Sequence, residues 1–346
     1  MKKLFFVFLL FDCLSASERV WPIFSFEVGP IYWRAQENGL PYTIESEETG
    51  NAGNDRHIQR NVKNIPSTKD WGCKAGINLL FPAMDCWDIS LEGLYFHAKA
   101  SAQTRINTDS NTLNSIKDLS LIWINFDNGF FPQSDAINFA KGQWNLLIRL
   151  ADLEIRKEFP IFEKFKLRAH AGVREADILQ RFHVFYGGQS TSQFYQSDIH
   201  MKNNFSGMGL KMGLDAFWMF VKQFAIYSSA SFSMLYGKFV IAHRENRFFH
   251  TTVPFQNTGS ITQANHYHNN VALADLFLGL QWQSSFMCDK WSAFVKVGWE
   301  QRFLFGQNQL MRFITVGSEG NVEGSFLSNQ GDLTLQGFSL AAGLGF

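Results

Sequence analysis

The chain has 346 residues, and its 31 lysines and arginines balance its 31 aspartates and glutamates. This balance excludes a nucleic-acid binder that relies on a basic surface. Hydrophobic residues make up 46% of the chain and charged residues 18%, which excludes a disordered protein. Beyond the N-terminus, no stretch approaches the roughly 18 consecutive apolar residues of a membrane-spanning helix.

The N-terminal residues predict export. The pair Lys2-Lys3 precedes an apolar run from Leu4 to Phe11, and Ser15-Ala16-Ser17 offers small residues for cleavage. We therefore expect residues 1–17 to be a secretory signal peptide. A lipoprotein anchor at Cys13 fits less well, because an aspartate stands where such a site has a small residue.

Apolar residues recur at every second position along most of the remaining chain. Between Met208 and Phe220 the even positions are apolar, whereas the odd ones include glycine, lysine and aspartate. The segment from Phe224 to Tyr236 repeats the pattern after a short turn. Such one-sided segments have about the length of a tilted strand that crosses an outer membrane, and tryptophans at their ends resemble its interfacial girdles.

Ten segments follow this pattern, and an even number is typical of bacterial single-chain barrels. They are about Phe24–Arg34, Trp71–Phe81, Trp87–Ala98, Trp144–Phe159, Phe165–Val184, Phe205–Phe220, Phe224–Phe239, Val271–Trp282, Trp291–Phe303 and Asp332–Phe346. Residues 18–346 are thus expected to form one all-β domain, a transmembrane antiparallel β-barrel of about ten strands. Twelve strands remain an alternative if Asn107–Phe126 or Leu310–Ser325 contains another hairpin.

The connections alternate between short and long. The short ones are Pro82–Cys86, Pro160–Lys164, Val221–Gln223 and Ser285–Lys290. The long polar ones include Glu37–Asp70, Ser101–Ala140 and Ala242–Asn269. Short periplasmic turns and long extracellular loops are typical of outer-membrane barrels, so the bacterial outer membrane is the expected location.

The C-terminal segment adds a separate indication. Its alternating apolar residues are Phe338, Leu340, Ala342, Leu344 and the final Phe346. A last strand of this kind resembles the assembly signal of outer-membrane barrels, with Phe338, Leu340, Leu344 and Phe346 presented to the barrel-assembly machinery. A soluble β-sandwich is the alternative interpretation.

Three positions interrupt the alternation. The apolar phase switches at Gly29-Pro30, where proline cannot donate a ladder hydrogen bond. A β-bulge there would explain the switch. Similar changes near Leu150 and Ala176 predict bulges or strands that extend beyond the membrane.

Charged residues on the polar faces are the candidate pore lining, because charge on a lipid-facing surface costs roughly 2–4 kcal/mol for lysine or arginine. The set comprises Asp152, Glu154, Arg156, Glu158, Lys166, Arg168, His170, Arg174, Lys211 and Asp215. We expect Glu158 to face Lys166 and Glu154 to face His170. The opposed charges either set ion selectivity in an open pore or neutralise each other in a filled lumen. Glycines 207, 209 and 213 would leave space for a channel.

No pattern indicates a metal, a cofactor or catalysis. His266 and His268, with His243 and His250 nearby, lack the spacing of known metal motifs and are interpreted as solvated loop residues. No nucleophile elbow or nucleotide-binding glycine motif is present. We therefore expect no enzyme activity, no cofactor and no metal.

Three cysteines remain after the expected signal peptide. Cys73 lies on an apolar face, whereas Cys86 and Cys288 fall in two predicted periplasmic turns. The turn cysteines are either free thiols or form intermolecular disulfides with another copy or with envelope proteins.

Several stretches, in order along nearly the whole mature chain, resemble the Legionella-type major outer membrane protein family, which is also represented among chlamydia-like bacteria. They are Ile31–Leu40, Trp87–Ile89 with Tyr95–His97, Lys141–Asn145, Gly209–Asp215, Leu235–Phe239, Gln307–Gln309 and Gly331–Gly337. The resemblance implies an abundant outer-membrane barrel with a porin role, and an envelope partly held together by disulfides. It supplies no catalytic residues.

Two functions follow as hypotheses. The first is a porin, a passive diffusion channel for small hydrophilic solutes and ions, embedded in outer-membrane lipid as a monomer or homo-oligomer. The second is a structural or adhesive surface protein whose barrel is filled and whose long loops act outside the cell.

Overall fold

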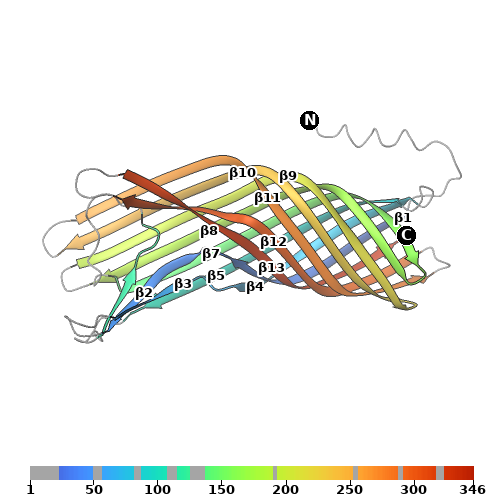
Figure 1. The fold of residues 1–346 in the computed structure, drawn as a ribbon, viewed down its shortest axis with the longest axis horizontal. Helices are drawn as coiled ribbons and strands as arrows, with labels where there is room; N and C mark the ends of the chain where they lie inside the picture. Colours follow the sequence, from blue (N-terminus) through green and yellow to red (C-terminus); the bar gives the residue numbers. More distant parts are fainter. Residues whose placement is uncertain are drawn as a thin grey trace.

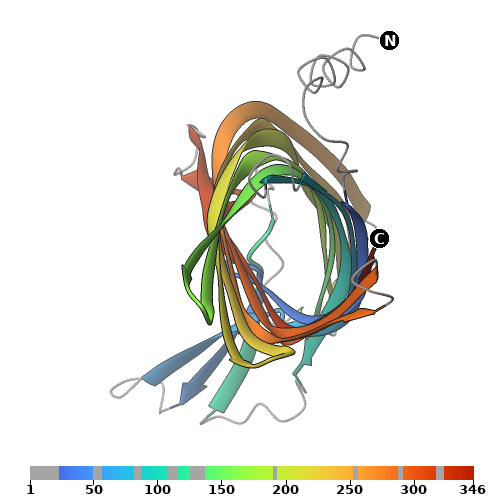
Figure 2. The same ribbon diagram turned by 90° about the vertical axis from the view of Figure 1, so that its right-hand side faces the viewer.

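The computed structural model describes residues 23–49, 57–81, 87–106, 115–124, 137–189, 193–251, 256–286, 291–316 and 323–346. Ten of its strands close into one antiparallel barrel (Figures 1 and 2). Among these described residues, no helix is long and apolar enough to span a membrane. The predicted signal peptide, and with it Cys13, lies outside the described residues.

The barrel order is β1-β13-β12-β11-β10-β9-β8-β7-β5-β4, and β4 pairs with β1 to close the ring. The bounds are β1 Ile23–Glu37, β4 Thr68–Phe81, β5 Trp87–Arg105, β7 Phe139–Phe162, β8 Phe165–Gln189, β9 Gln193–Val221, β10 Phe224–Thr251, β11 Gln256–Phe286, β12 Trp291–Val316 and β13 Glu323–Gly345. The predicted all-β barrel of ten strands is confirmed.

The alternative of twelve strands is wrong. The described residues of segment 310–325 add no further hairpin, because they belong to the end of β12 and the beginning of β13. Strand β6 (Ser115–Ser120), in the other candidate segment, pairs with β2 (Pro41–Thr49) outside the barrel. The strands are also longer than predicted, up to 31 residues in β11.

The register fixes the size of the barrel. Starting at Glu37 on β1, we step from each residue to its paired residue on the next strand until the ring returns to β1, at Ser25. Ser25 is twelve residues from Glu37 (37 − 25), and this offset is the stagger of the strands around the barrel. The path is Glu37, Leu333, Leu304, Leu273, Ser233, Lys211, Gly172, Glu154, Ser90, Asn78 and Ser25. Ten tilted strands with this stagger form a narrow barrel, close to the eight-stranded size that side chains can fill.

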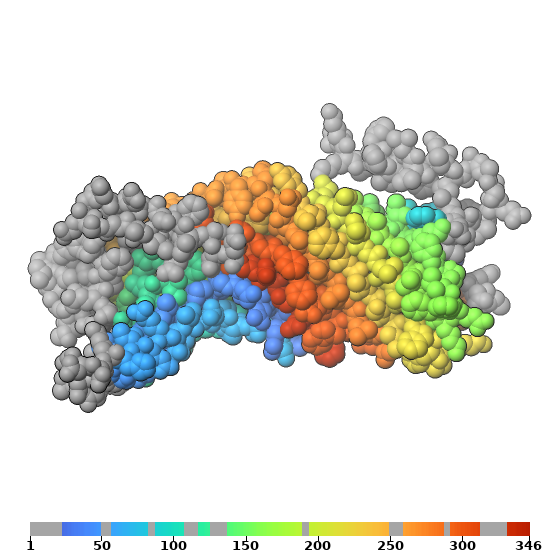
Figure 3. Space-filling view, in the orientation of Figure 1, coloured from blue at the N-terminus to red at the C-terminus, as the bar shows by residue number. Residues whose placement is uncertain are grey.

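Strands β2 (Pro41–Thr49) and β3 (His57–Asn64) form a separate small sheet with β6, in the order β3-β2-β6. This sheet projects from the end of the barrel opposite the chain's C-terminal residue (Figures 1 and 3). Lys63 pairs with Glu45 at 2.7 Å, which raises the pKa of the Lys63 amine. The predicted long loops at this end are therefore partly built from strands.

The alternation of inward and outward side chains in β1 is uninterrupted, so the predicted bulge at Gly29-Pro30 is wrong. The registers with β4 and β13 are the same on both sides of Pro30. Phe26 and Val28 face outward and are exposed, whereas Ile31 and Trp33 face inward and are buried. The apolar residues change from even to odd positions because the barrel interior becomes apolar at this level. The backbone itself stays regular.

The phase changes near Leu150 and Ala176 have the same cause. Leu150 and Asp152 both face inward on β7, and Arg174 and Ala176 both face inward on β8. No register shift lies between β7 and β8 at these positions. Of the two predicted explanations, bulges are wrong, and strands that extend beyond the outer apolar band account for the pattern.

The outer face carries the lipid-facing band. On β9 the outward residues from Met208 to Phe220 are apolar, whereas those from Gln196 to Ser206 are polar. Phe338, Leu340 and Leu344 face outward on β13 and are exposed. Phe346, directly after β13, is also exposed and pairs with Phe24 through two backbone hydrogen bonds. Cys73 is exposed on the same band as a free thiol, while Cys86 and Cys288 lie outside the described residues.

Candidate functional site

The ten predicted pore-lining residues all face the barrel interior. They occupy even positions on β7 and β8 and odd positions on β9, which alternation directs inward. The pairing between β7 and β8 differs from the prediction by two residues, because both strands extend to a turn at Glu163-Lys164. Glu158 is opposite Arg168 and Glu154 is opposite Gly172. The predicted contacts still form diagonally, with Lys166 Nζ 2.8 Å from Glu158 and His170 Nδ1 3.2 Å from Glu154.

Arg174 is the centre of the most buried ion-pair group and is 0% exposed. Its Nε and Nη2 donate to the two carboxylate oxygens of Asp152, each at 2.7 Å. Its Nη1 donates to Asp275 at 2.6 Å and to Ser233 at 3.0 Å. Lys211 is a second cation of the group, with its Nζ 2.7 Å from Asp152. The group joins the five neighbouring strands β7, β8, β9, β10 and β11.

A second group lies nearer the short turns. Arg168 donates to Asp215 at 2.8 and 2.9 Å, and His170 Nε2 lies 3.7 Å from Asp215. Arg156 pairs with Asp88 on β5. Buried charges need partners of this kind, because an unpaired ion inside a protein is strongly unfavourable.

A third group, on the opposite wall, was missed by the sequence prediction. Lys74 on β4 donates to Glu300 on β12 at 2.6 Å, and Lys296 donates to Glu27 on β1 at 3.2 Å. Arg302 donates to Glu300 at 2.9 Å. The signal was available, because Lys296, Glu300 and Arg302 stand at alternate positions on the polar side of β12. Their partners Lys74 and Glu27 lie on strands that are far away in sequence.

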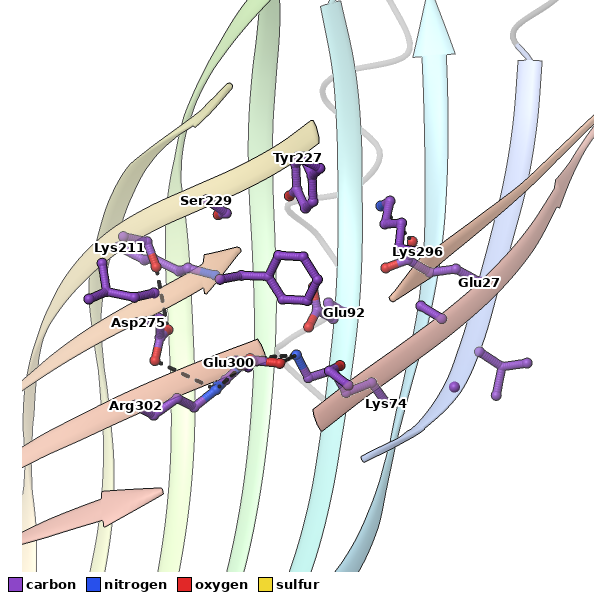
Figure 4. A pocket seen from close by; sticks show the side chains of 17 residues that line it. Glu27, Lys74, Glu92, Lys211, Tyr227, Ser229, Asp275, Lys296, Glu300 and Arg302 are labelled. Carbon is purple, nitrogen blue, oxygen red and sulfur yellow. Dashed lines mark hydrogen bonds and ion pairs between the residues drawn. The ribbon is translucent and has the colours of Figure 1, made fainter. Parts of the chain in front are cut away.

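We call these groups together the charged layer. It comprises Glu27, Lys74, Asp88, Glu92, Asp152, Glu154, Arg156, Arg168, His170, Arg174, Lys211, Asp215, Asp275, Lys296, Glu300 and Arg302. Beside them is a cavity with about 720 Å³ of non-protein space, open solvent included. Figure 4 shows that charged side chains from many strands point toward this space, together with Tyr227 and Ser229.

A second set of inward residues forms what we call the apolar layer. It includes Ile31, Trp33, Phe96, Trp144, Leu146, Ile148, Phe182, Phe205, Phe239, Leu273, Leu304 and Leu335, which are all buried in one hydrophobic cluster. Along β7 the apolar layer ends at Leu150 and the charged layer begins at Asp152. The Trp33 ring marks the boundary, since Lys74 Nζ and Arg302 Cζ lie 5.4 and 5.3 Å from its centroid.

Segments from outside the barrel wall pack onto the apolar layer. Tyr186, inward on β8, donates its hydroxyl to the backbone oxygen of Tyr42 at 2.6 Å and accepts the N–H of Ile122 at 3.1 Å. The Trp123 ring packs edge-on against Phe182 at 5.7 Å. The beginning of β2 and the residues after β6 therefore cover the barrel end that carries the small sheet.

Polar side chains also bridge the lumen. Gln180 on β8 donates to Glu37 on β1 at 3.1 Å, although four strand-to-strand steps separate these strands around the ring. Asn203 on β9 donates to the backbone oxygen of Gln307 on β12 at 2.7 Å. These contacts make a constriction between opposite walls.

The interior glycines do not leave the space that was predicted. A Cβ on Gly213 would lie 2.4 Å from His170 Nε2, and one on Gly207 would lie 2.5 Å from the Phe205 ring. His170 on the neighbouring strand β8 and Phe205 on β9 itself therefore fill these positions. The histidines that were interpreted as solvated loop residues lie on strands instead. His243 is buried inside the barrel, so the interpretation is wrong for it, whereas His266 and His268 are exposed on the outer face of β11.

Comparison with known proteins identifies the family. Residues 20–345 match the model of a family described as Legionella pneumophila major outer membrane protein precursor. No curated protein sequence matches the chain.

Among solved structures, the outer membrane protease OmpT of Escherichia coli is 13% identical over 96% of this chain and 99% of its own, with a TM-score of 0.37. A Pseudomonas aeruginosa FadL homologue is 8% identical over 94% and 90%, with a TM-score of 0.26. The toluene transporter TodX of P. putida is 7% identical over 93% and 89%, with a TM-score of 0.27. These likenesses are too distant to carry activity or substrate.

The family match covers nearly the whole chain, and the closed barrel has an apolar outer band around a charged interior. The chain belongs to the Legionella major outer membrane protein family and is a β-barrel protein of the bacterial outer membrane.

Proposed function

We propose that the barrel is a narrow porin, which lets ions and small hydrophilic solutes diffuse through the charged layer. The observation that carries the proposal is the composition of this layer, whose charged side chains line a cavity inside the barrel. Ion pairs are an inefficient filling, because well-packed apolar residues of similar volume are often neutral or more stabilising. The same barrel fills its apolar layer with such residues, so the charges in the charged layer indicate a role other than packing.

The lining predicts the kind of solute. Cations and anions alternate around the cavity, where Lys74, Glu300 and Arg302 face Lys211 and Asp275 (Figure 4). A lining that carries both positive and negative charges can bind small ions and polar molecules. It provides no apolar surface along which an apolar solute could move. The Glu37–Gln180 constriction limits the size of what passes. We propose no catalytic activity for this interior.

Single-channel recording tests the proposal. The mature chain is refolded, checked for heat-modifiable gel mobility, and inserted into a planar bilayer in potassium chloride. We expect discrete current steps, small for a porin because of the constriction. A folded barrel that inserts without producing current would contradict the proposal.

A second function has a specific observation in its favour. The apolar layer and its covering segments close much of one barrel end, as a structural or adhesive surface protein would allow. In that case the small sheet β3-β2-β6 would carry the activity. A silent, folded barrel that retains attachment of cells or envelope proteins, and loses it when β2 and β3 are replaced by a short linker, would support this function.

A further inference from the structure

We propose that the outer face of the barrel carries a binding site for a divalent transition-metal ion of the zinc type, formed by His183, Asp198 and His200. These are the three residues, within the described parts of the chain, whose potential ligand atoms gather closely enough to hold a metal ion. Each of the three residues offers one ligand atom, and these three atoms lie within 4.8 Å of one another. The site faces away from the lumen and is independent of the porin proposal.

Strand pairing brings the ligands together. His183 on β8 is directly opposite His200 on β9, and both face outward. Their rings are stacked, with centroids 4.3 Å apart and planes 3° from parallel. Asp198 precedes His200 by two residues and therefore faces the same side. It contacts His183 Nε2 through Oδ1, and its Oδ2 lies 3.4 Å from His200 Nε2.

A neighbouring amide orients one imidazole for coordination. Gln143 on β7 is directly opposite His183, and its Oε1 lies 3.2 Å from His183 Nδ1. An amide oxygen can only accept a hydrogen bond, so Nδ1 donates its proton to Gln143. Nε2 donates to the Asp198 carboxylate and is the nitrogen that would coordinate a metal ion once its proton is displaced. A second-shell acceptor of this kind is typical of metal-binding histidines, because it fixes the tautomer and the ring orientation.

The donor set fits the proposed ion. Two imidazole nitrogens and one carboxylate oxygen are common protein ligands of Zn²⁺, and a three-ligand site leaves a fourth position for water or an exogenous ligand. The side chains are 32%, 36% and 55% exposed for His183, Asp198 and His200, so the fourth position is open to solvent. A simple ion pair would need only one histidine, whereas the Asp198 carboxylate contacts both His183 and His200.

The position on the barrel is suitable for a soluble ion. The outward residues of β9 between the site and the lipid-facing band are Lys202, Asn204 and Ser206. The site thus lies beyond the lipid, on the same side as the small sheet. Arg244 on β10 is in register with His200 and adds a positive charge at the edge of the site, so its neutralisation should strengthen metal binding.

The test is a zinc titration of the refolded, full barrel without a histidine tag, followed by calorimetry, with cobalt absorption as a second readout. We expect one zinc ion per barrel and weaker binding at pH 5.5, because imidazoles must be deprotonated to coordinate. H183A, H200A and D198N should each weaken binding at least tenfold. Q143A keeps all ligands and should weaken it by about 10–100-fold, as second-shell substitutions typically do.

The matched control is H266A/H268A, which removes two exposed outward histidines of β11 and should leave binding unchanged. Heat-modifiable mobility shows that each variant folds. The proposal is overturned if the wild-type barrel binds no zinc, or if folded H183A and H200A barrels bind it as tightly as the wild type. It is also overturned if H266A/H268A is the variant that loses binding.

Discussion

The charged layer and the apolar layer share the same ten strands but differ in what their inward side chains do. In the charged layer the outer face meets lipid and the interior holds ion pairs such as Arg174–Asp152 and Lys74–Glu300. In the apolar layer the outer face is polar and the interior is a hydrophobic core around Trp33 and Phe182. Where the barrel crosses the membrane it is therefore apolar outside and charged inside. Beyond the membrane the arrangement is reversed, as in a water-soluble protein with a hydrophobic core.

The first test removes one partner of the most buried ion-pair group. R174M should lower the free energy of unfolding by about 3–5 kcal/mol, because Asp152 and Asp275 would keep buried charges without their shared guanidinium. Urea unfolding of the barrel in lipid vesicles, followed by tryptophan fluorescence, measures it. The control is R149M, because Arg149 is exposed and 3.3 Å from Asp177. Its effect should stay below about 1 kcal/mol; equal losses would contradict the account.

The second test probes the apolar layer. Leu146 is buried inside β7, whereas Leu153 on the same strand faces lipid. L146A should cost about 2–5 kcal/mol, because it leaves a cavity in a packed interior. L153A should cost less, since lipid chains can refill the space. The same urea titration compares them, and a greater loss for L153A would show that the apolar layer does not carry the stability.

The third test acts on the constriction. Q180A removes the side chain that reaches Glu37 across the lumen and should enlarge the single-channel current step. The control is Q36A, because Gln36 precedes Glu37 but faces outward. A current that is unchanged in both variants would place the narrowest point elsewhere.

The smallest effect is expected at the rim of the charged layer. Glu158 and Lys166 are 34% and 38% exposed, so E158Q should change the unfolding free energy by less than about 1 kcal/mol. It removes a negative charge near one end of the path and should move the reversal potential in a salt gradient toward anion preference. An unchanged reversal potential would argue against a path past this pair.

The sequence predicted the barrel well because one signal repeats on every strand. An apolar face such as that from Met208 to Phe220 requires lipid on one side. The same signal made the predicted strands too short. Beyond the lipid the outward residues become polar, so the one-sided apolar pattern ends before the strand does. The phase switch at Pro30 was misinterpreted as a bulge, although Ile31 and Trp33 simply belong to the apolar layer.

Side-chain sites were harder to predict than strands. Asp152, Glu154 and Arg156 were found because they are consecutive inward positions. Lys74 and Glu300 are far apart in sequence and meet only across the closed ring. Likewise His183 and His200 become neighbours only through the register of β8 with β9, so spacing rules for metal motifs could not reveal them.

The most direct measurement compares single-channel currents of the wild type and the triple variant D152L/R174M/D275L. This variant replaces Asp152, Arg174 and Asp275 by apolar side chains of similar size. Lys211 keeps Glu154 as a partner and Arg302 keeps Glu300, so the variant should still fold. If the charged layer provides the solute path, the current steps should shrink or disappear. A folded triple variant with the wild-type current would contradict the account, because the charges would then serve only to fill the barrel.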